Sequence, residues 1–304
     1  MSQVSPLVVG ANARQMGRIP TAPLIAGYAK ELGIDVSDYF TGMTDIDIYE
    51  CERSGYRYFT PFSLTGREDL YHHLEKFDWN YKPEKWEYDQ AAGLLAKDNS
   101  IRTVLDVGCG KGFFLAIAKR HHLVGTGLEL NSSAASVAKS QGLDVRTEMI
   151  EDHARDNPGR YDAVVTFQVL EHIPTVRPFL EGCIEALRPG GTLIIGVPNN
   201  DGFLKHANAV LNAPPHHMGL WTRKSLESLA GIFPLKLRSV TTEPLAEIDW
   251  YLSVQERRFL PPVARKAYYK LGLSKAARRL VAASSPRIAG HTILTVYEKI
   301  TPET

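Results

Sequence analysis

Continuous apolar runs of strand length alternate with helical stretches from Ile101 onward. Strands that are buried on both faces show such runs instead of an alternation of apolar and polar residues. The pattern therefore predicts an α/β fold with a doubly wound, mostly parallel sheet that is covered by helices on both faces. The predicted strands are Thr103–Val107, Leu123–Leu128, Ala163–Phe167 and Thr192–Val197, and the predicted helices are Gly112–Arg120, Ser133–Ser140 and Val176–Leu187.

A further strand, Gly290–Lys299, is expected to close the sheet and to enter it antiparallel to the others. Pro189, Gly190 and Gly191 predict a turn before the strand that begins at Thr192. In sheets of this class, ligands bind at the carboxyl ends of the strands, near the point where the strand order reverses. The functional residues should therefore follow the strands directly.

The N-terminal part of the chain has a different pattern. Residues 1–65 are rich in Gly, Tyr and Thr and show no sustained period, which predicts short helices and loops. From Leu70 to Lys97 the apolar spacing becomes helical. We therefore expect residues 1–97 to form a leader with a helical cap. Residues 98–304 should form the main domain, with a helical insertion at about 250–288.

This insertion contains the one strongly basic stretch of the chain. Between residues 254 and 287, a single acid, Glu256, stands among nine basic residues: Arg257, Arg258, Arg265, Lys266, Lys270, Lys275, Arg278, Arg279 and Arg287. A solvated helix face is the simpler interpretation of such a run. The alternative is a surface for an acidic substrate, or for peripheral contact with an anionic membrane.

The chain as a whole is nearly neutral, with 35 Lys and Arg, 34 Asp and Glu, and a formal net charge of +1 over 304 residues. No global basic field therefore recruits nucleic acid. The three cysteines lie far apart, which argues against a disulfide framework. The first residues do not resemble a signal peptide, and no apolar run approaches the ~20 residues of a membrane span. We expect a soluble, cytoplasmic protein.

The first predicted strand runs into three glycines at alternate positions, Gly108, Gly110 and Gly112, and then into a helix. Glycines let a ligand approach the backbone, and the helix N-terminus offers free N–H donors. The loop is not a Walker A loop, because Lys111 is followed by Gly112 and not by Ser or Thr. It is a poor dinucleotide fingerprint, because Phe113 stands where the third glycine belongs.

The remaining pattern, Asp-x-Gly-x-Gly-x-Gly from Asp106 to Gly112, resembles the first motif of the class I, Rossmann-like methyltransferases that use S-adenosylmethionine. Glu129 follows the next strand, seventeen residues beyond Gly112, and a carboxylate there can accept both hydroxyls of a ribose. The resemblance implies this role for Glu129 and places Asp106 near the positively charged methionine end. The cofactor residues that it implies here are Asp106, Gly108, Cys109, Gly110, Gly112, Phe113, Glu129 and Leu130.

Two later segments extend the resemblance. In this family, the loop after the third strand covers the adenine with an apolar residue and places a polar group near its amine. The matching positions are Met149, Ile150 and Glu151, and Gln168 after the fourth strand would line the pocket. The sequence Leu-Glu-His-Ile at 170–173 resembles the branch that includes ubiquinone-pathway O-methyltransferases and many sugar methyltransferases.

The N-terminal segment resembles the leader of bacterial methyltransferases associated with surface polysaccharides and other glycans. The matching residues are Tyr49–Tyr56, Phe59–Pro61, Leu70–Tyr71 and Lys85–Glu87. Many such leaders carry a C-x-x-C pair that suggests a zinc knuckle, but Ser54 stands at the second position here. Because Cys51 alone cannot form a tetrahedral zinc site, we predict no metal.

Methyl transfer to oxygen requires an aligned acceptor and a group that takes the hydroxyl proton. Histidine is the usual base near neutral pH. The candidates are His172, at the end of the fourth strand, and His216 and His217, in a loop stiffened by two prolines. His172 is equally well explained as support for the cofactor loop, and the three histidines show no metal-site spacing.

Together, these features predict an S-adenosylmethionine-dependent methyltransferase that O-methylates a sugar or glycan precursor, with a small-molecule or glycan acceptor that could be acidic. The first alternative is O-methylation of a phenolic quinone precursor or another small metabolite. The leader and the basic insertion argue against it, because a compact quinone-ring enzyme would not obviously need them. The second alternative is a regulatory protein that binds the cofactor without turnover.

Overall fold

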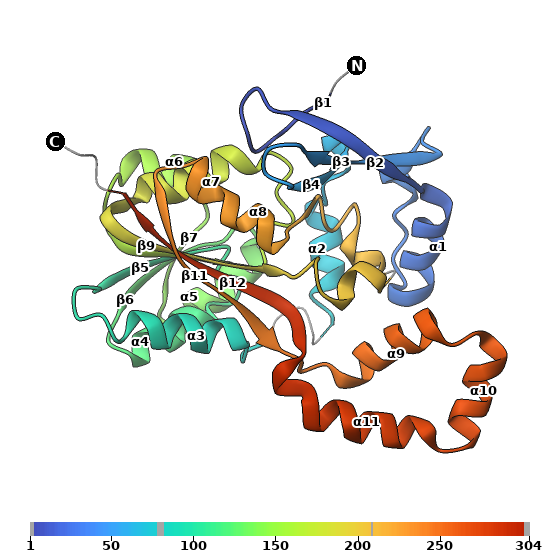
Figure 1. Ribbon diagram of the computed structural model, residues 1–304. Helices are drawn as coiled ribbons and strands as arrows, with labels where there is room; N and C mark the ends of the chain where they lie inside the picture. Colours follow the sequence, from blue (N-terminus) through green and yellow to red (C-terminus); the bar gives the residue numbers. More distant parts are fainter. Residues whose placement is uncertain (1–2, 78–81, 208, 301–304) are drawn as a thin grey trace.

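Two sheets organise the chain in the computed structural model, which describes residues 3–77, 82–207 and 209–300 (Figure 1). The larger sheet has seven strands in the order β11-β12-β9-β8-β5-β6-β7. The smaller sheet has five strands in the order β1-β2-β3-β4-β10.

The seven-stranded sheet confirms the predicted class of fold. Its parallel strands are β5 (Thr103–Val107), β6 (Val124–Leu128), β7 (Asp144–Arg146), β8 (Tyr161–Phe167) and β9 (Leu187–Pro198). The last strand, β12 (Ala289–Lys299), runs antiparallel between β9 and β11 (Leu235–Pro244). The strand order reverses at β5, because β6 lies on one side of it and β8 on the other.

The turn predicted at Pro189–Gly191 lies inside β9 and does not precede it. Gly190 adopts a positive φ of 72° there, and the pairing of β9 with β8 shifts register between Tyr161 and Ala163. The glycines therefore form an irregularity within a longer strand.

Helices cover both faces of this sheet (Figure 1). One layer contains α3 (Trp86–Leu95), α4 (Phe113–Arg120) and α5 (Ser132–Ser140), and the other contains α6 (Ile150–Asp156), α7 (Val176–Ala186) and α8 (Arg223–Glu227). Consecutive side chains of β5 pack against opposite helix layers. Val104 packs with α3 and α4, whereas Leu105 packs with α6 and α7. This burial on both sides explains the continuous apolar runs.

The prediction of short helices and loops for residues 1–65 was largely wrong. The segment forms an antiparallel sheet of β1 (Gln3–Val4), β2 (Asn12–Pro20), β3 (Asp45–Cys51) and β4 (Arg57–Thr60), with α1 (Thr21–Leu32) between β2 and β3. The ion pairs Arg14–Glu50 and Arg18–Asp47 join β2 to β3 across about thirty intervening residues. Local periodicity cannot reveal a pairing that depends on contacts so distant in sequence.

The leader is joined to the main domain by strand pairing and by a common apolar cluster. The short strand β10 (Gly219–Leu220) pairs with β4, and buried leader residues such as Leu7 and Tyr56 belong to the same apolar cluster as Val164 and Leu193 of the large sheet. The predicted helical stretch from Leu70 corresponds to α2 (Glu68–Leu74) and α3, while its residues 78–81 lie outside the described part. Short 3-10 segments occupy Ser37–Phe40, Phe62–Leu64, Phe203–His206, Val210–Asn212, Ser228–Gly231 and Ser285–Arg287.

The predicted helical insertion is present between β11 and β12 as α9 (Ile248–Phe259), α10 (Pro262–Lys270) and α11 (Leu273–Ser284). These three helices, which we call the arm, project from the body of the molecule at the lower right of Figure 1. Neither α10 nor α11 contains a buried residue. Among the described residues, no helix combines the length and apolar character needed to cross a bilayer.

Candidate active site

The glycine loop lies between β5 and α4, where the strand order reverses. Gly108, Gly110 and Gly112 all have positive φ values, of 78°, 54° and 79°. A Cβ on Gly108 would lie 2.4 Å from Cγ2 of Val169, and one on Gly112 would lie 2.4 Å from Cδ1 of Leu143. Both positions therefore require glycine for backbone conformation and for space.

Glu129, after β6, is bonded to this loop. Its Oε2 accepts the backbone N–H of Gly110 at 2.8 Å, and its Oε1 accepts that of Asn131 at 2.7 Å. Burial raises the pKa of Glu129 above its ordinary value. Each carboxylate oxygen has two lone pairs, so both can accept a further hydrogen bond from a ribose diol.

Asp106 is a buried carboxyl group at the end of β5. Burial first, and then the nearby charge of Glu129, raise the pKa of Asp106 to about 8. A bound ammonium or sulfonium group would favour its ionised form, because opposite charges attract strongly in a poorly solvated site. The carboxyl group thus suits a cationic ligand and would repel a pyrophosphate.

The segment after β7 provides the residues that the resemblance assigns to the adenine. Met149 is exposed at the start of α6, whereas Ile150 is buried in the core and packs against Gly182 of α7. Oε2 of Glu151 is buried and has no hydrogen-bond partner. An unpartnered buried acceptor is costly, and the amino group of an adenine could satisfy it.

The other predicted cofactor residues border the same edge of the sheet. Cys109 is buried against Gly127, Phe113 is half-buried at the start of α4, and Leu130 is exposed. Gln168, after β8, has a positive φ of 57° and donates from Nε2 to Glu87 at 3.2 Å. A non-glycine residue in this conformation is uncommon and is often found at functional sites. The glycine cradle and the two acids together fit S-adenosylmethionine.

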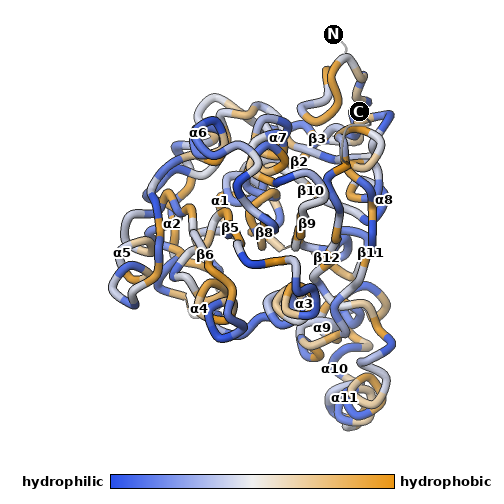
Figure 2. The backbone as a smooth tube through the Cα atoms, turned by 90° about the vertical axis from the view of Figure 1, so that its left-hand side faces the viewer, coloured by the Kyte–Doolittle hydropathy of each residue, from blue (hydrophilic) through white to orange (hydrophobic). Residues whose placement is uncertain are grey.

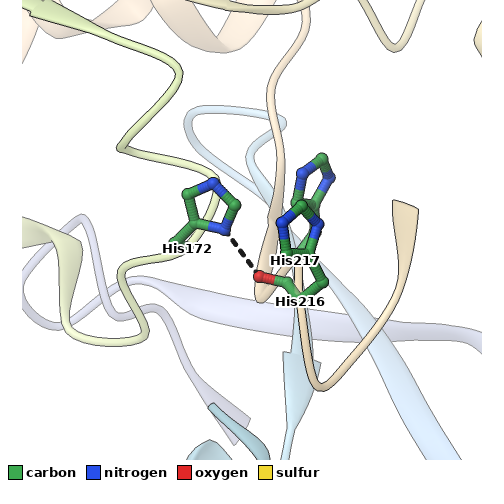
Figure 3. A group of neighbouring side chains, drawn as sticks. All are labelled: His172, His216 and His217. Carbon is green, nitrogen blue, oxygen red and sulfur yellow. Dashed lines mark hydrogen bonds between the residues drawn. The ribbon is translucent and has the colours of Figure 1, made fainter. Parts of the chain in front are cut away.

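The structure brings the three candidate histidines together, although 43 residues separate His172 from His216. Figure 3 shows the His172 ring facing the neighbouring rings of His216 and His217. The ring centroids are 4.6 Å apart for His172 and His216, 4.9 Å for His172 and His217, and 4.6 Å for the adjacent pair.

Hydrogen bonds determine the tautomer of each ring. Nδ1 of His172 donates to the carbonyl oxygen of His216 at 2.7 Å, and Nδ1 of His216 donates to that of Leu211 at 3.1 Å. Nδ1 of His217 lies 3.1 Å from Oδ1 of Asn212. Burial lowers the pKa of His172 to about 4 and lowers the pKa values of His216 and His217 well below 6.5. The rings are therefore neutral at pH 7, with the Nε2 lone pairs left as acceptors.

Neutral imidazoles can accept protons or bind a divalent metal. One ring nitrogen from each histidine lies within 4.8 Å of the others, and metal-binding histidines commonly donate their second nitrogen to an oxygen, as these do. The three histidines could thus bind a metal ion, although their spacing in the sequence does not indicate a metal site. The prediction that Cys51 holds no metal stays a prediction.

Sequence reasoning assigned no role to Glu171, which is buried directly before His172. Its Oε1 lies 3.9 Å from Nε2 of His172, and its Oε2 has no hydrogen-bond partner. Burial raises the pKa of Glu171 to about 8, and the charge of Lys85 opposes this rise. The ring of Tyr71 lies edge-on to His172 at 5.8 Å. Tyr71 and Lys85 belong to the leader motifs Leu70–Tyr71 and Lys85–Glu87. These motifs are the feature of the sequence that could have indicated this site.

A family model described as a methyltransferase domain matches residues 79–239. The ubiquinone biosynthesis O-methyltransferase of Vibrio atlanticus is 31% identical over 158 residues, which are 50% of this chain and 62% of that protein. The protein of the same name from Escherichia coli K12 is 32% identical over 120 residues, which are 38% of this chain and 48% of that protein. The chain therefore spans about half to six-tenths of these curated relatives.

Solved structures share the fold at low sequence identity. A SAM-dependent methyltransferase from Archaeoglobus fulgidus is 17% identical with a TM-score of 0.50, and the match covers 75% of this chain and all of that one. A chain in the complex between the Haloferax volcanii Trm112 methyltransferase activator and the putative methyltransferase is 19% identical with a TM-score of 0.54, covering 78% of this chain and 97% of that one. The chain therefore belongs to the methyltransferase-domain family and has the fold of the S-adenosylmethionine-dependent methyltransferases.

Proposed function

We propose that this protein is an O-methyltransferase that acts on a phenolic hydroxyl of a small molecule. The observation that carries this proposal is the cluster of three neutral histidines beside the buried carboxyl group of Glu171. The cluster begins at the carboxyl end of β8, the strand next to the one that leads into the glycine loop. A cofactor and an acceptor would therefore meet at the same edge of the sheet.

Bound S-adenosylmethionine supplies a methyl group that its sulfonium has already activated. The protein must then align the acceptor oxygen and accept its proton. A lone pair on Nε2 of a cluster histidine takes the hydroxyl proton, and His172 can pass a proton to Glu171, whose Oε1 lies 3.9 Å from its Nε2. Burial raises the pKa of Glu171 and lowers the pKa of His172, so this transfer is favoured when Glu171 is ionised.

The weak basicity of these histidines favours a phenol over an alcohol. A phenolic hydroxyl has an ordinary pKa of about 10 and loses its proton far more readily than an aliphatic hydroxyl. The curated relatives are named as ubiquinone biosynthesis O-methyltransferases, which supports the same choice. A sugar or glycan precursor is the second candidate, because the glycan-associated leader motifs contribute Tyr71, Lys85 and Glu87 near the cluster.

Methyl-labelled cofactor distinguishes these acceptors. The full chain is incubated with catechol and dihydroxybenzoate in one series, and with free and nucleotide-linked hexoses in another. We expect label in the phenols. Transfer to the hexoses alone would overturn the phenolic proposal and support the second candidate. Cofactor binding by calorimetry without transfer to any acceptor, including a whole metabolite extract, would favour the non-catalytic regulatory alternative.

A further inference from the structure

The arm carries a charge opposite to that of the rest of the protein. The arm, residues 248–284, contains eight Lys and Arg and two acids, Asp249 and Glu256, which gives a net charge of +6. Because the whole chain carries +1, all other residues together carry −5. The positive charge is therefore concentrated on the part of the molecule that projects farthest from the two sheets (Figure 1).

The arm also exposes large apolar side chains. Val263 is 82% exposed, and Leu271 and Leu280 are each 71% exposed. Phe259, Tyr269 and Leu273 are exposed as well. Figure 2 shows hydrophilic and hydrophobic stretches side by side along α10 and α11. Single exposed apolar residues are ordinary, but six within 22 consecutive residues require a partner or a function.

Apolar and basic side chains share one face of α10. Val263 and Ala267 are four residues apart and lie on the same side of the helix, and Leu271 continues this line. Lys266 and Lys270 lie three and seven residues after Val263 and border that line. Among the described residues, neither lysine forms an ion pair within the chain. Both ammonium groups are thus available to an external anion.

The inner side of the arm is already occupied. Val254 and Val281 pack with Phe203 and Leu245 at its base, and Arg278 pairs with Asp249 at 2.7 Å. Leu252, Glu256, Tyr269 and Arg278 are among the residues that line the hollow between the helices. Val263, Leu271 and Leu280 do not line this hollow and are strongly exposed, as are Lys266 and Lys270.

We propose that the arm docks the protein on an anionic lipid surface. Short helices that combine basic residues with exposed Leu, Val and Phe bind at the interface between headgroups and acyl chains. The apolar side chains enter this interface, while lysine stems lie along it and keep their ammonium groups at the headgroups. A lipid surface that carries negative charge would attract the arm, whose net charge is +6. This inference does not depend on the proposed function.

Co-sedimentation of the full chain with vesicles tests the proposal. Vesicles of phosphatidylcholine and phosphatidylglycerol in equal parts should bind the protein, and vesicles of phosphatidylcholine alone should bind it at least tenfold more weakly. The double variant Lys266→Glu with Lys270→Glu should weaken binding to the anionic vesicles roughly 25-fold or more, because each basic residue near such a surface contributes about a fivefold factor. Val263→Ser with Leu271→Ser should weaken binding to the anionic vesicles as well.

The matched control reverses two exposed lysines far from the arm, Lys97→Glu with Lys139→Glu, and should keep vesicle binding within about twofold of the wild type. All variants should bind S-adenosylhomocysteine like the wild type, which verifies folding. Equal binding to neutral and anionic vesicles, equal losses in the arm and control variants, or no binding to either vesicle would each overturn the proposal. The last result would favour an acidic protein partner.

Discussion

The backbone N–H of Gly110 donates to Oε2 of Glu129 at 2.8 Å, and so joins the loop after β5 to the end of β6. The second oxygen of Glu129 accepts the N–H of Asn131, which caps α5. The carboxylate proposed to bind the ribose therefore also fixes the loop that approaches the cofactor. Loop position and the proposed ribose contact would thus depend on the same side chain.

Replacing Glu129 should weaken cofactor binding more than the loss of one hydrogen bond would suggest. In Glu129→Gln, the amide NH2 must face the N–H of either Gly110 or Asn131, because each carboxylate oxygen already accepts one of them. We expect the dissociation constant of S-adenosylhomocysteine, measured by calorimetry, to rise about 10- to 100-fold. Glu181→Gln, an exposed position on α7, is the control. Unchanged affinity in Glu129→Gln would contradict the proposed ribose contact.

Two glycines give opposite predictions for the same substitution. Gly108→Ala places a Cβ at a φ of 78° and 2.4 Å from Val169, so it should lower the free energy of unfolding by about 2–4 kcal/mol. Gly93→Ala, within α3, meets no atom within 4 Å and should raise the free energy of unfolding by about 0.5–1 kcal/mol. Denaturant unfolding measures both. A Gly108→Ala protein as stable as the wild type would show that the loop has room for a side chain.

The buried carboxyl group of Asp106 should make the stability of the cofactor-free protein depend on pH. Its pKa is about 8 in the folded chain and 3.8 in the unfolded chain, so only the folded chain holds this proton between those values. The resulting stability is fully present below about pH 4 and is lost as the pH rises through about 8. Asp106→Asn should reduce the fall in the free energy of unfolding between about pH 5 and pH 9. Glu171, whose pKa is also raised to about 8, should maintain part of that fall.

Asp144→Asn is the control. Its free energy of unfolding, measured with denaturant, should depend on pH as that of the wild type does, because Asp144 is exposed on the edge strand β7. An Asp106→Asn protein with the full wild-type pH dependence would show that Asp106 is ionised in the folded state.

Burial on both faces made most of the large sheet predictable. The predicted strand Thr103–Val107 coincides with β5, and α4, α5 and α7 lie within a residue or two of their predicted bounds. β11 was missed, because it is an edge strand in which exposed polar residues such as Lys236, Ser239 and Thr241 alternate with half-buried ones. Such a strand lacks the continuous apolar run that identifies an inner one.

The cofactor loop was predictable from local sequence, whereas the histidine cluster was not. Asp106 and the three glycines lie in one continuous strand, turn and helix, and Glu129 follows the next strand. Their arrangement therefore follows from neighbouring elements of the chain. The meeting of His172 with His217 depends instead on a long connection after β9, and on Met218 and Gly219, which donate to the carbonyl oxygen of Glu171. No local period reports such a contact.

Methyl transfer should not require a metal, because the proposed chemistry uses the histidines as proton acceptors. EDTA should leave the rate unchanged, and added Zn²⁺ should inhibit by occupying the Nε2 lone pairs. Calorimetry should show that His217→Ala loses zinc binding, and that His121→Ala, at an exposed position, keeps it. Activity that disappears with EDTA and returns with a divalent metal would instead make the cluster a metal centre.

Removal of the proton acceptors should separate turnover from cofactor binding. His216→Ala and His217→Ala should lower kcat far more than they change cofactor affinity, by up to the 10²–10⁴-fold that a positioned base contributes. Because Glu171 must be ionised to receive a proton from His172, kcat should rise with pH through about 8. Glu171→Gln should remove this rise, whereas a purely structural role would lower kcat equally at every pH. His206→Ala, on a short 3-10 turn, is the control. Unchanged turnover in both His216→Ala and His217→Ala would assign the base role to His172 or leave alignment as the source of the rate.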